Sequence, residues 1–198
     1  MAGTINDFRS SFKTDLARPS RFDVQFNIPL VLAPYVTNAR QLTYRCENAD
    51  LPGRTLETTE RKFGSAPRQK FPYYTMYNES TMSFIVSDDM SEKIMFEGWI
   101  ESINPTSNYN FNYKASYVSD IIITQYDVSN KPSYQVTLID AFPIAVNQLD
   151  LDWSSDGHHK LTVVFAYTSW TNNSLSSLFK NVEQQAINNA LFTNNGIL

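Results

Sequence analysis

The sequence predicts a mainly β protein with antiparallel strands, and three observations support this prediction. Several segments alternate apolar and polar residues with a period of two, which is typical of half-buried strands. The gaps between these segments are short and rich in proline and asparagine, so a crossover helix cannot follow every strand. The chain has 198 residues, 42% apolar and 18% charged, so it is globular and long enough for one domain with appended pieces.

The strand pattern occurs in six segments. Alternation is clearest in 22–28 and 161–167, where every second residue is apolar. The segment 121–126 is instead an almost continuous run of β-branched and aromatic residues, a composition that also favours a strand. The predicted strands are 22–28, 42–46, 82–86, 121–126, 134–138 and 161–167.

A helix of about 89–103 is predicted in the middle of the chain. Asp88 and Asp89 can cap it, and Glu92 follows Asp89 at the spacing of a capping box. Pro105 ends it. The apolar residues that fall on one face at helical spacing are Phe96, Trp99, Ile100 and Ile103.

A second helix is predicted near the C-terminus, over about 174–191. We therefore divide the chain into a β domain, 1–170, and a helical extension, 171–198. A helix with one apolar stripe should lie on a surface of its own subunit or of a neighbour. The stripe consists of Leu175, Leu178, Phe179, Val182, Ala186 and Ala190.

The segment 52–72 is predicted to be a long basic arm loop. It carries five bases and two glutamates, a local charge of 5 − 2 = +3, whereas 101–156 has seven acids and two lysines, or −5. Such asymmetry suits self-association through complementary patches, and a flexible surface loop with solvated charges is the alternative interpretation. The bases are Arg54, Arg61, Lys62, Arg68 and Lys70.

No catalytic, metal or cofactor site is predicted. The sequence lacks nucleotide-binding and G-x-S-x-G motifs, and its single cysteine, Cys46, cannot form an internal disulfide or a cysteine zinc cluster. His158 and His159 are adjacent and would point to opposite faces of a strand. Asp150 and Asp152 could pair for acid–base chemistry, but a solvated acidic strand end explains them more simply.

Membrane and nucleic-acid partners are also not expected. The net charge is −4, which is not typical of proteins that bind phosphate-rich surfaces. The start of the chain lacks the apolar core of a secretory signal, and the most apolar run, 28–36, is interrupted by Pro29 and Pro34.

Three aromatic residues alternate with asparagines at Tyr109, Phe111 and Tyr113. Such residues can stack on sugars or bases. Because so little positive charge surrounds them, we favour a contact with another subunit or with the core.

A series of short signatures follows the chain in a specific order. They are ARP at 17–19, the 22–28 strand, Cys46, LPG at 51–53, the 82–87 strand leading to Trp99, IIITQYD at 121–127, DAFP at 140–143, LDLDWS at 149–154 and VVFAYTSW at 163–170. In this order the chain resembles the tail tube proteins of contractile-tailed bacteriophages over about 16–170. It departs from them in a longer 28–40 link and in the chain beyond Trp170.

This resemblance implies an antiparallel β-sandwich or barrel with one flanking helix. Six copies would form a ring whose inner sheets join as a barrel around a lumen, and rings would stack into a tube for DNA delivery. The arm would reach neighbouring subunits and rings, where its bases could meet Asp150, Asp152 and Asp156. DNA would pass without specific binding along a wall free of cations. Our wall candidates are Thr81, Ser83, Gln135, Thr137 and Thr162.

The implied partners are further copies of the chain, a tail sheath protein outside, and baseplate and tail-terminator proteins at the ends. No membrane partner is implied, and the location is the virion tail, assembled in the host cytoplasm. Alternatives are a baseplate tube-initiator or a tube of a bacterial contractile secretion system. A carbohydrate-binding β-sandwich is a further alternative from a different class.

Overall fold

The computed structural model describes residues 5–11, 16–32, 39–154 and 156–173. The predicted C-terminal helix, 174–191, lies outside this part of the chain. The described helices are α1 (Ile5–Ser11), the 3-10 helix η1 (Leu30–Leu32), α2 (Ala39–Arg45), α3 (Ser91–Ile103) and α4 (Lys114–Tyr117). The strands are β1 (Phe22–Phe26), β2 (Cys46–Ala49), β3 (Arg54–Arg61), β4 (Gln69–Tyr77), β5 (Ser80–Ile85), β6 (Ser119–Tyr126), β7 (Pro132–Val146), β8 (Lys160–Ala166) and β9 (Ser169–Asn172).

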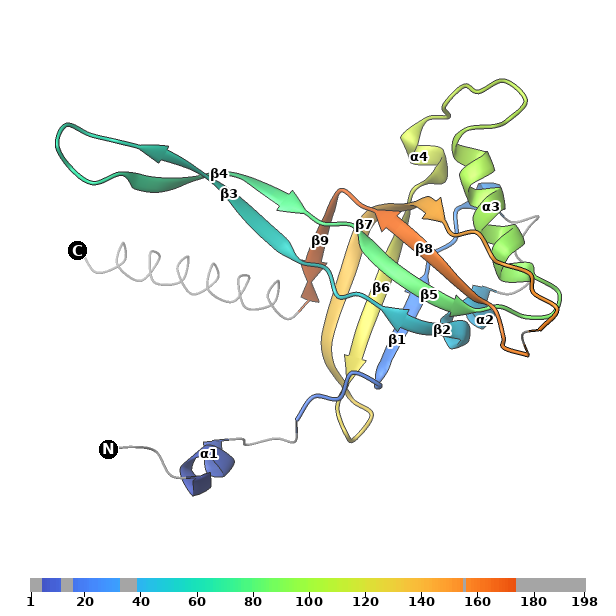
Figure 1. Ribbon diagram of the computed structural model, residues 1–198, viewed down its shortest axis with the longest axis horizontal. Coiled ribbons are helices and arrows are strands. Elements are labelled where there is room, and N and C mark those ends of the chain that lie inside the picture. Colours follow the sequence, from blue (N-terminus) through green and yellow to red (C-terminus); the bar gives the residue numbers. More distant parts are fainter. Residues whose placement is uncertain (1–4, 12–15, 33–38, 155, 174–198) are drawn as a thin grey trace, which may run out of the picture.

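Seven strands form one antiparallel sheet that folds over on itself at β7 (Figure 1). The strand order is β1-β6-β7-β8-β5-β2. Strand β9 is not part of this order and pairs with β7. The first part of β7 pairs with β6 and β9, whereas residues from Phe142 onward pair with β8. Between these parts, Asp140 has a left-handed backbone with φ 56°, an uncommon conformation for a residue other than glycine.

The fold therefore has two layers that share β7. We call β1, β6, the first part of β7 and β9 the first layer, and β2, β5, β8 and the end of β7 the second layer. Phe26 of the first layer contacts Phe84 and Phe165 of the second, with ring centroids 5.8 Å and 6.1 Å apart. The inward faces of the two layers thus form one core.

Helix α3 closes one side of this core. The ring centroid of Phe96 lies 4.9 Å from that of Phe84, and Trp99 lies 6.2 Å from Phe165. Trp99 is fully buried, and its indole Nε1 donates a hydrogen bond of 2.7 Å to the carbonyl of Tyr117. This bond satisfies the polar atom of the largest buried side chain.

The predicted mainly β, antiparallel class is confirmed, and five of the six predicted strands correspond to β1, β5, β6, β7 and β8. The predicted helix 89–103 is α3, which begins at Ser91. Its capping box differs from the prediction because Glu92 accepts a hydrogen bond of 2.9 Å from the backbone N–H of Ser87, and not from Asp89.

The prediction of a strand at 42–46 is wrong. Most of this segment is the end of α2, and β2 begins only at Cys46. Leu42 is buried while Tyr44 is 78% exposed, so these residues do not share one face of a strand. A period of two over only three residues is too short to exclude a helix.

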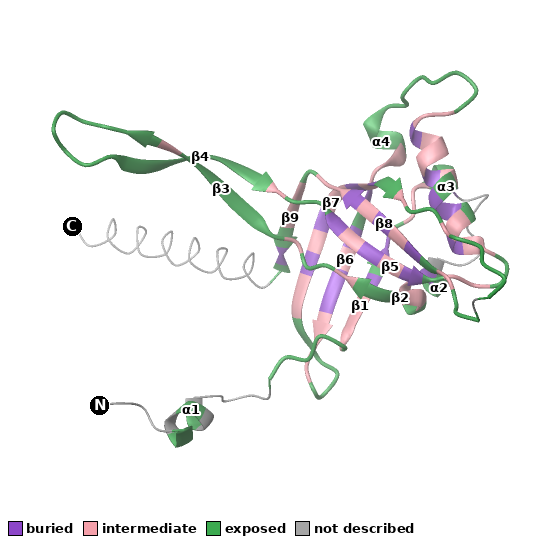
Figure 2. Cartoon of the chain, viewed as in Figure 1, coloured by how far each residue is buried: buried purple, intermediate pink, exposed green. Residues whose placement is uncertain are grey.

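The arm is a β-hairpin and not a loop, which corrects the predicted arm loop 52–72. β3 pairs with β4 from Arg54 opposite Tyr77 to Arg61 opposite Gln69, so the arm continues five residues beyond Pro72. Pro72, which cannot donate to the ladder, lies beside a register shift. The hairpin projects from the body, and most of it is exposed (Figure 2).

We expect Trp99→Ala to lower the free energy of unfolding by about 3–5 kcal/mol, because it removes the largest core side chain and leaves a cavity. Ile94 is the control on the same helix, since it is 51% exposed. Ile94→Ala should change the free energy by less than about 1 kcal/mol. Urea unfolding followed by circular dichroism measures both, and equal effects would show that α3 does not close the core.

Candidate assembly surfaces

The outward face of the first layer is almost uncharged. Register places its side chains in rows across the strands, and Asp23 is the only charged residue in the described rows. Gln135 Nε2 donates a hydrogen bond of 3.3 Å to Thr124 Oγ1 within one row. One row consists of Asp23, Thr124 and Gln135. The row next to it consists of Gln25, Ile122, Thr137 and Thr171.

The five wall candidates lie on two different surfaces. Gln135 and Thr137 belong to the outward face of the first layer. Thr81, Ser83 and Thr162 belong to β5 and β8 of the second layer, where the hydroxyls of Ser83 and Thr162 are 3.3 Å apart. Because the inward faces pack against each other, one wall can contain only one of these groups.

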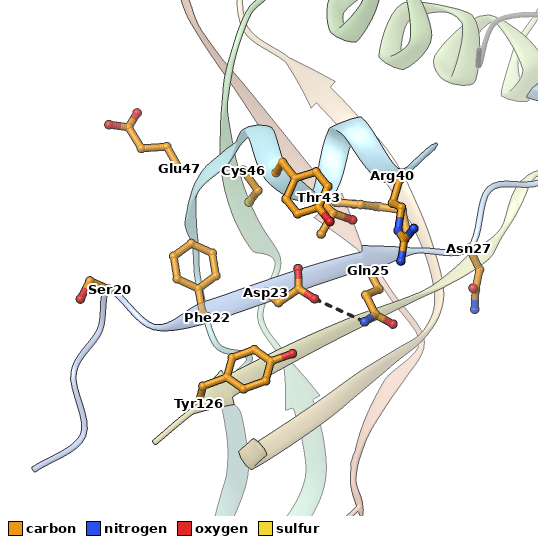
Figure 3. Close-up of a pocket in the computed structure, with 12 residues that line it drawn as sticks. Ser20, Phe22, Asp23, Gln25, Asn27, Arg40, Thr43, Cys46, Glu47 and Tyr126 are labelled. Carbon is orange, nitrogen blue, oxygen red and sulfur yellow. Dashed lines mark hydrogen bonds between the residues drawn. The ribbon is translucent and has the colours of Figure 1, made fainter. Parts of the chain in front are cut away.

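The outer edge of β1 lies beside a groove. β1 ends the strand order, and a groove of about 1060 Å³ separates it from α2 and the start of β2 (Figure 3). Its lining includes Asp23 and Gln25 of β1, and Arg40 and Thr43 of α2. The other edge of the first layer is β9, which lies on the far side of β7.

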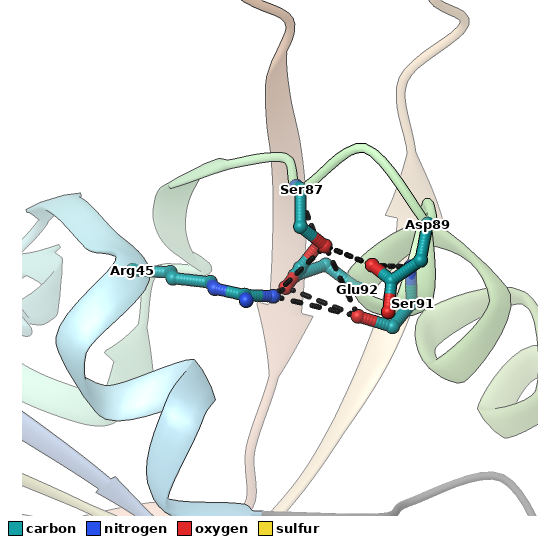
Figure 4. A network of polar contacts seen from close by, with 5 residues as sticks. All are labelled: Arg45, Ser87, Asp89, Ser91 and Glu92. Carbon is teal, nitrogen blue, oxygen red and sulfur yellow. Dashed lines mark hydrogen bonds and ion pairs between the residues drawn. The ribbon is translucent and has the colours of Figure 1, made fainter.

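A buried ion pair holds α2 against α3. Glu92 is buried and its carboxylate pairs with the Arg45 guanidinium, which also donates a hydrogen bond of 2.9 Å to Ser87 Oγ (Figure 4). Asp89 accepts hydrogen bonds from Ser87 and Ser91, and these bonds lower the pKa of its carboxyl. The network fixes the helical wall of the groove to the core.

Cys46 also lines the groove but is not a nucleophile. Burial is the main cause that raises the pKa of its thiol to about 12. The thiol therefore stays protonated at neutral pH, and a protonated thiol is a poor nucleophile.

The hairpin combines apolar and basic side chains. Register places Met76, Tyr74 and Phe71 on one face, where Phe63 stacks edge-on against Phe71 with centroids 6.4 Å apart. Glu60 lies 3.5 Å from Arg68 and 3.9 Å from Lys70, so two of the five predicted bases are paired within the hairpin. Sequence reasoning found the bases and overlooked the apolar face, which depends on strand register.

The three predicted acidic residues lie between β7 and β8, at the opposite end of the molecule from the hairpin (Figure 1). The Asp152 carboxylate accepts hydrogen bonds from the backbone and hydroxyl of Ser154, which lower its pKa. Leu151 and Trp153 beside it are strongly exposed. Asp150 and Asp152 share a hollow with His158 and His159, and Asp156 follows in the same connection.

Tyr109, Phe111 and Tyr113 are exposed, so they are not part of the core. Their loop is held by its own polar groups, since Asn112 Nδ2 donates a hydrogen bond of 2.8 Å to the Ser102 carbonyl. No group of three or more potential metal ligands occurs among the described residues. None of the described helices has the length and apolar character that a membrane crossing requires.

Similar folds occur in contractile injection systems. A chain of the anti-feeding prophage baseplate matches with a TM-score of 0.60 and 15% identity, over 80% of this chain and 96% of that chain. A chain of the anti-feeding prophage tube-terminating cap matches with a TM-score of 0.59 and 16% identity, over 87% of this chain and 99% of that chain. A chain of the sheath-tube complex of PVC, an extracellular contractile injection system, in its extended state matches with a TM-score of 0.57 and 14% identity, over 87% of this chain and 99% of that chain.

At such identities the likeness establishes a shared fold. Open sheet edges, a projecting hairpin and exposed aromatic residues characterise this β-sandwich as one of the class with surfaces suited to association with further chains. The family model described as phage tail tube protein matches residues 17–173. This chain belongs to the phage tail tube protein family, and its function is that of a structural tube subunit. No curated protein sequence matches it.

We expect Glu92→Gln to lower the free energy of unfolding by about 3 kcal/mol, because it leaves the Arg45 charge without its buried partner. Glu97→Gln is the matched control, since Glu97 lies at the surface, 2.9 Å from Lys93. That substitution should cost about 0.5 kcal/mol or less. Chemical unfolding of both variants measures the difference, and similar costs would contradict a structural role of the buried pair.

Proposed function

We propose that this tail tube protein forms hexameric rings that stack into a conduit for DNA delivery, without enzymatic activity. The observation that carries the proposal is the first layer. It has four antiparallel strands, open edges at β1 and β9, and an outward face without cations in its described rows. A wall of this kind neither binds nor stops a sliding polyanion.

The strand directions suit ring closure. Because neighbouring strands alternate in direction across the first layer, β9 of one copy runs antiparallel to β1 of a copy placed beside it. Joining these edges would continue the sheet and remove both exposed edges. The contact joins two different surfaces, so its repetition can close a ring.

The first layer supplies the lumen wall in this arrangement. Gln135 and Thr137 would face the lumen together with the rest of their rows. Thr81, Ser83 and Thr162 would face the opposite side, toward a sheath protein. The outward face of the second layer carries Lys160, paired with Glu47 at 2.7 Å, which makes it the less suitable wall for DNA.

The basic hairpin and the acidic loop would link successive rings. They lie at opposite ends of the molecule and have opposite charge, so a stacked copy could bring them together (Figure 1). The contributing bases are Arg54, Arg61, Lys62, Arg68 and Lys70, and the acids are Asp150, Asp152 and Asp156.

The structural relatives support the remaining partners. Similar chains occur in structures described as a baseplate, a tube-terminating cap and a sheath-tube complex. We therefore propose a sheath protein around the tube, and baseplate and tail-terminator proteins at its ends. Assembly would take place in the host cytoplasm before the tail joins the virion.

Electron microscopy of the purified chain tests the function directly. We expect rings and stacked tubes, and we expect Arg61→Glu with Lys62→Glu to shorten the tubes while leaving single rings intact, because the reversed charges repel the acidic loop. Tubes of unchanged length would contradict electrostatic stacking. Rings that never elongate in the unmodified chain would indicate a tube-initiator, and a monomer at all concentrations would contradict the proposed function.

Labelling with a bulky maleimide identifies the lumen wall. In a Cys46→Ser background, Thr137→Cys should react about tenfold more slowly in tubes than in single rings, because the reagent cannot diffuse freely along the lumen. Ser83→Cys, on the other layer, should react equally fast in both. The reverse pattern would show that the second layer lines the lumen.

A further inference from the structure

One face of the β3–β4 hairpin carries a row of apolar side chains that the body of the molecule leaves exposed. Register places Phe71, Tyr74 and Met76 on this face, and Phe63 stacks against Phe71 at its outer end. All four are more than a third exposed. We call these four residues the apolar face of the hairpin. Because an isolated two-stranded hairpin is marginal in water, a hairpin that projects from the body needs packing on one of its faces.

The chain passes the base of the hairpin shortly before the described residues end. Trp170 of β9 donates a hydrogen bond of 3.2 Å from its indole Nε1 to the carbonyl of Gly53, directly before β3. At the end of β4, the ring of Tyr77 lies 6.3 Å from that of Tyr167. Residue 174 follows Trp170 by four positions, and a chain extends at most about 3.5 Å per residue. A helix that starts there therefore starts within about 14 Å of the hairpin base.

The predicted C-terminal helix has the length needed to cover the apolar face. Its range, 174–191, lies outside the described residues and beyond the 17–173 that the family model matches. At about 1.5 Å per residue, an α-helix over this range is about 27 Å long. β4 has nine residues, which at about 3.3 Å per residue extend about 30 Å. The helix can therefore reach from the base of the hairpin to its outer end.

The predicted helix also suits the apolar face in side-chain size and charge. Its stripe has large residues over 175–182 and only alanines at 186 and 190. The apolar face has Tyr74 and Met76 toward the base and two phenylalanines at the outer end. Small residues opposite large rings allow close packing. The range 174–191 carries one lysine and one glutamate, so neither the basic hairpin nor the acidic loop attracts it by net charge.

We propose that residues 174–191 form a helix whose stripe packs on the apolar face of the hairpin of the same subunit. This inference goes beyond the proposed function and does not depend on ring formation. The helix would hold the hairpin in its projecting position before any other chain binds, which lowers the cost of ordering it during assembly. The opposite face of the hairpin, with Arg54, Glu60 and Lys70, would remain exposed.

Photo-crosslinking of the full-length chain tests this contact. With p-benzoyl-phenylalanine in place of Tyr74, we expect cross-links to 175–190 of the same chain, identified by mass spectrometry on a mixture of isotopically labelled and unlabelled chains. The same probe in place of Thr75, the next residue on the opposite face, is the matched control and should not reach this segment. Cross-links from position 74 to a different copy, or to no part of 175–190, would overturn the inference.

Hydrogen exchange of dilute subunits gives an independent readout. Phe179→Asp places a carboxylate in the stripe and should make the backbone amides of 54–61 and 69–77 exchange about tenfold faster, because the hairpin loses its packing partner. Gln184→Asp adds the same charge on the opposite side of the predicted helix and should leave these rates unchanged. Equal rates in the two variants would overturn the inference. Because neither measurement requires rings, a chain that forms no rings would overturn the proposed function alone.

Discussion

The aromatic contact between the two layers is the interaction on which the rest of the structure depends. Phe26 reaches Phe84 and Phe165 across the core, and Phe96 and Trp99 of α3 pack on the same rings. These aromatic residues form one core with the buried aliphatic side chains of both layers. Burial of large aromatic side chains supplies most of the stability of such a core, so the outward faces do not have to contribute to it and can serve assembly.

A single strand makes both layers possible. β7 pairs with β6 and β9 up to Ala141 and with β8 from Phe142 onward, so the left-handed residue Asp140 lies where the strand passes from one layer to the other. Lys114 Nζ lies 3.0 Å from the Asp140 carboxylate, and this contact lowers the pKa of that carboxyl. The ionised side chain thereby ties α4 to this part of β7. In the proposed ring, one layer would then face the lumen while the other faces outward.

Open edges are the second constraint on this fold. β1 and β9 are edge strands of one layer, and exposed edges favour association with other strands. In a monomer they would promote aggregation, but in the proposed ring they would form the contact between subunits. The buried pair of Arg45 and Glu92 contributes here because it ties α2, one wall of the groove beside β1, to α3. A rigid groove restricts which partner the edge accepts.

The sequence by itself determined the class of the protein, five strands, the main helix and the family, because alternation and capping are local patterns and the signatures follow a specific order. It also identified the bases of the arm and the acids of the opposite loop. Tertiary structure decided that Leu42 belongs to a helix, that the arm is a hairpin, and that Ser83 and Thr137 lie on different surfaces. Alternation shows which residues of a strand point the same way, but only pairing between distant strands assigns that strand to a layer.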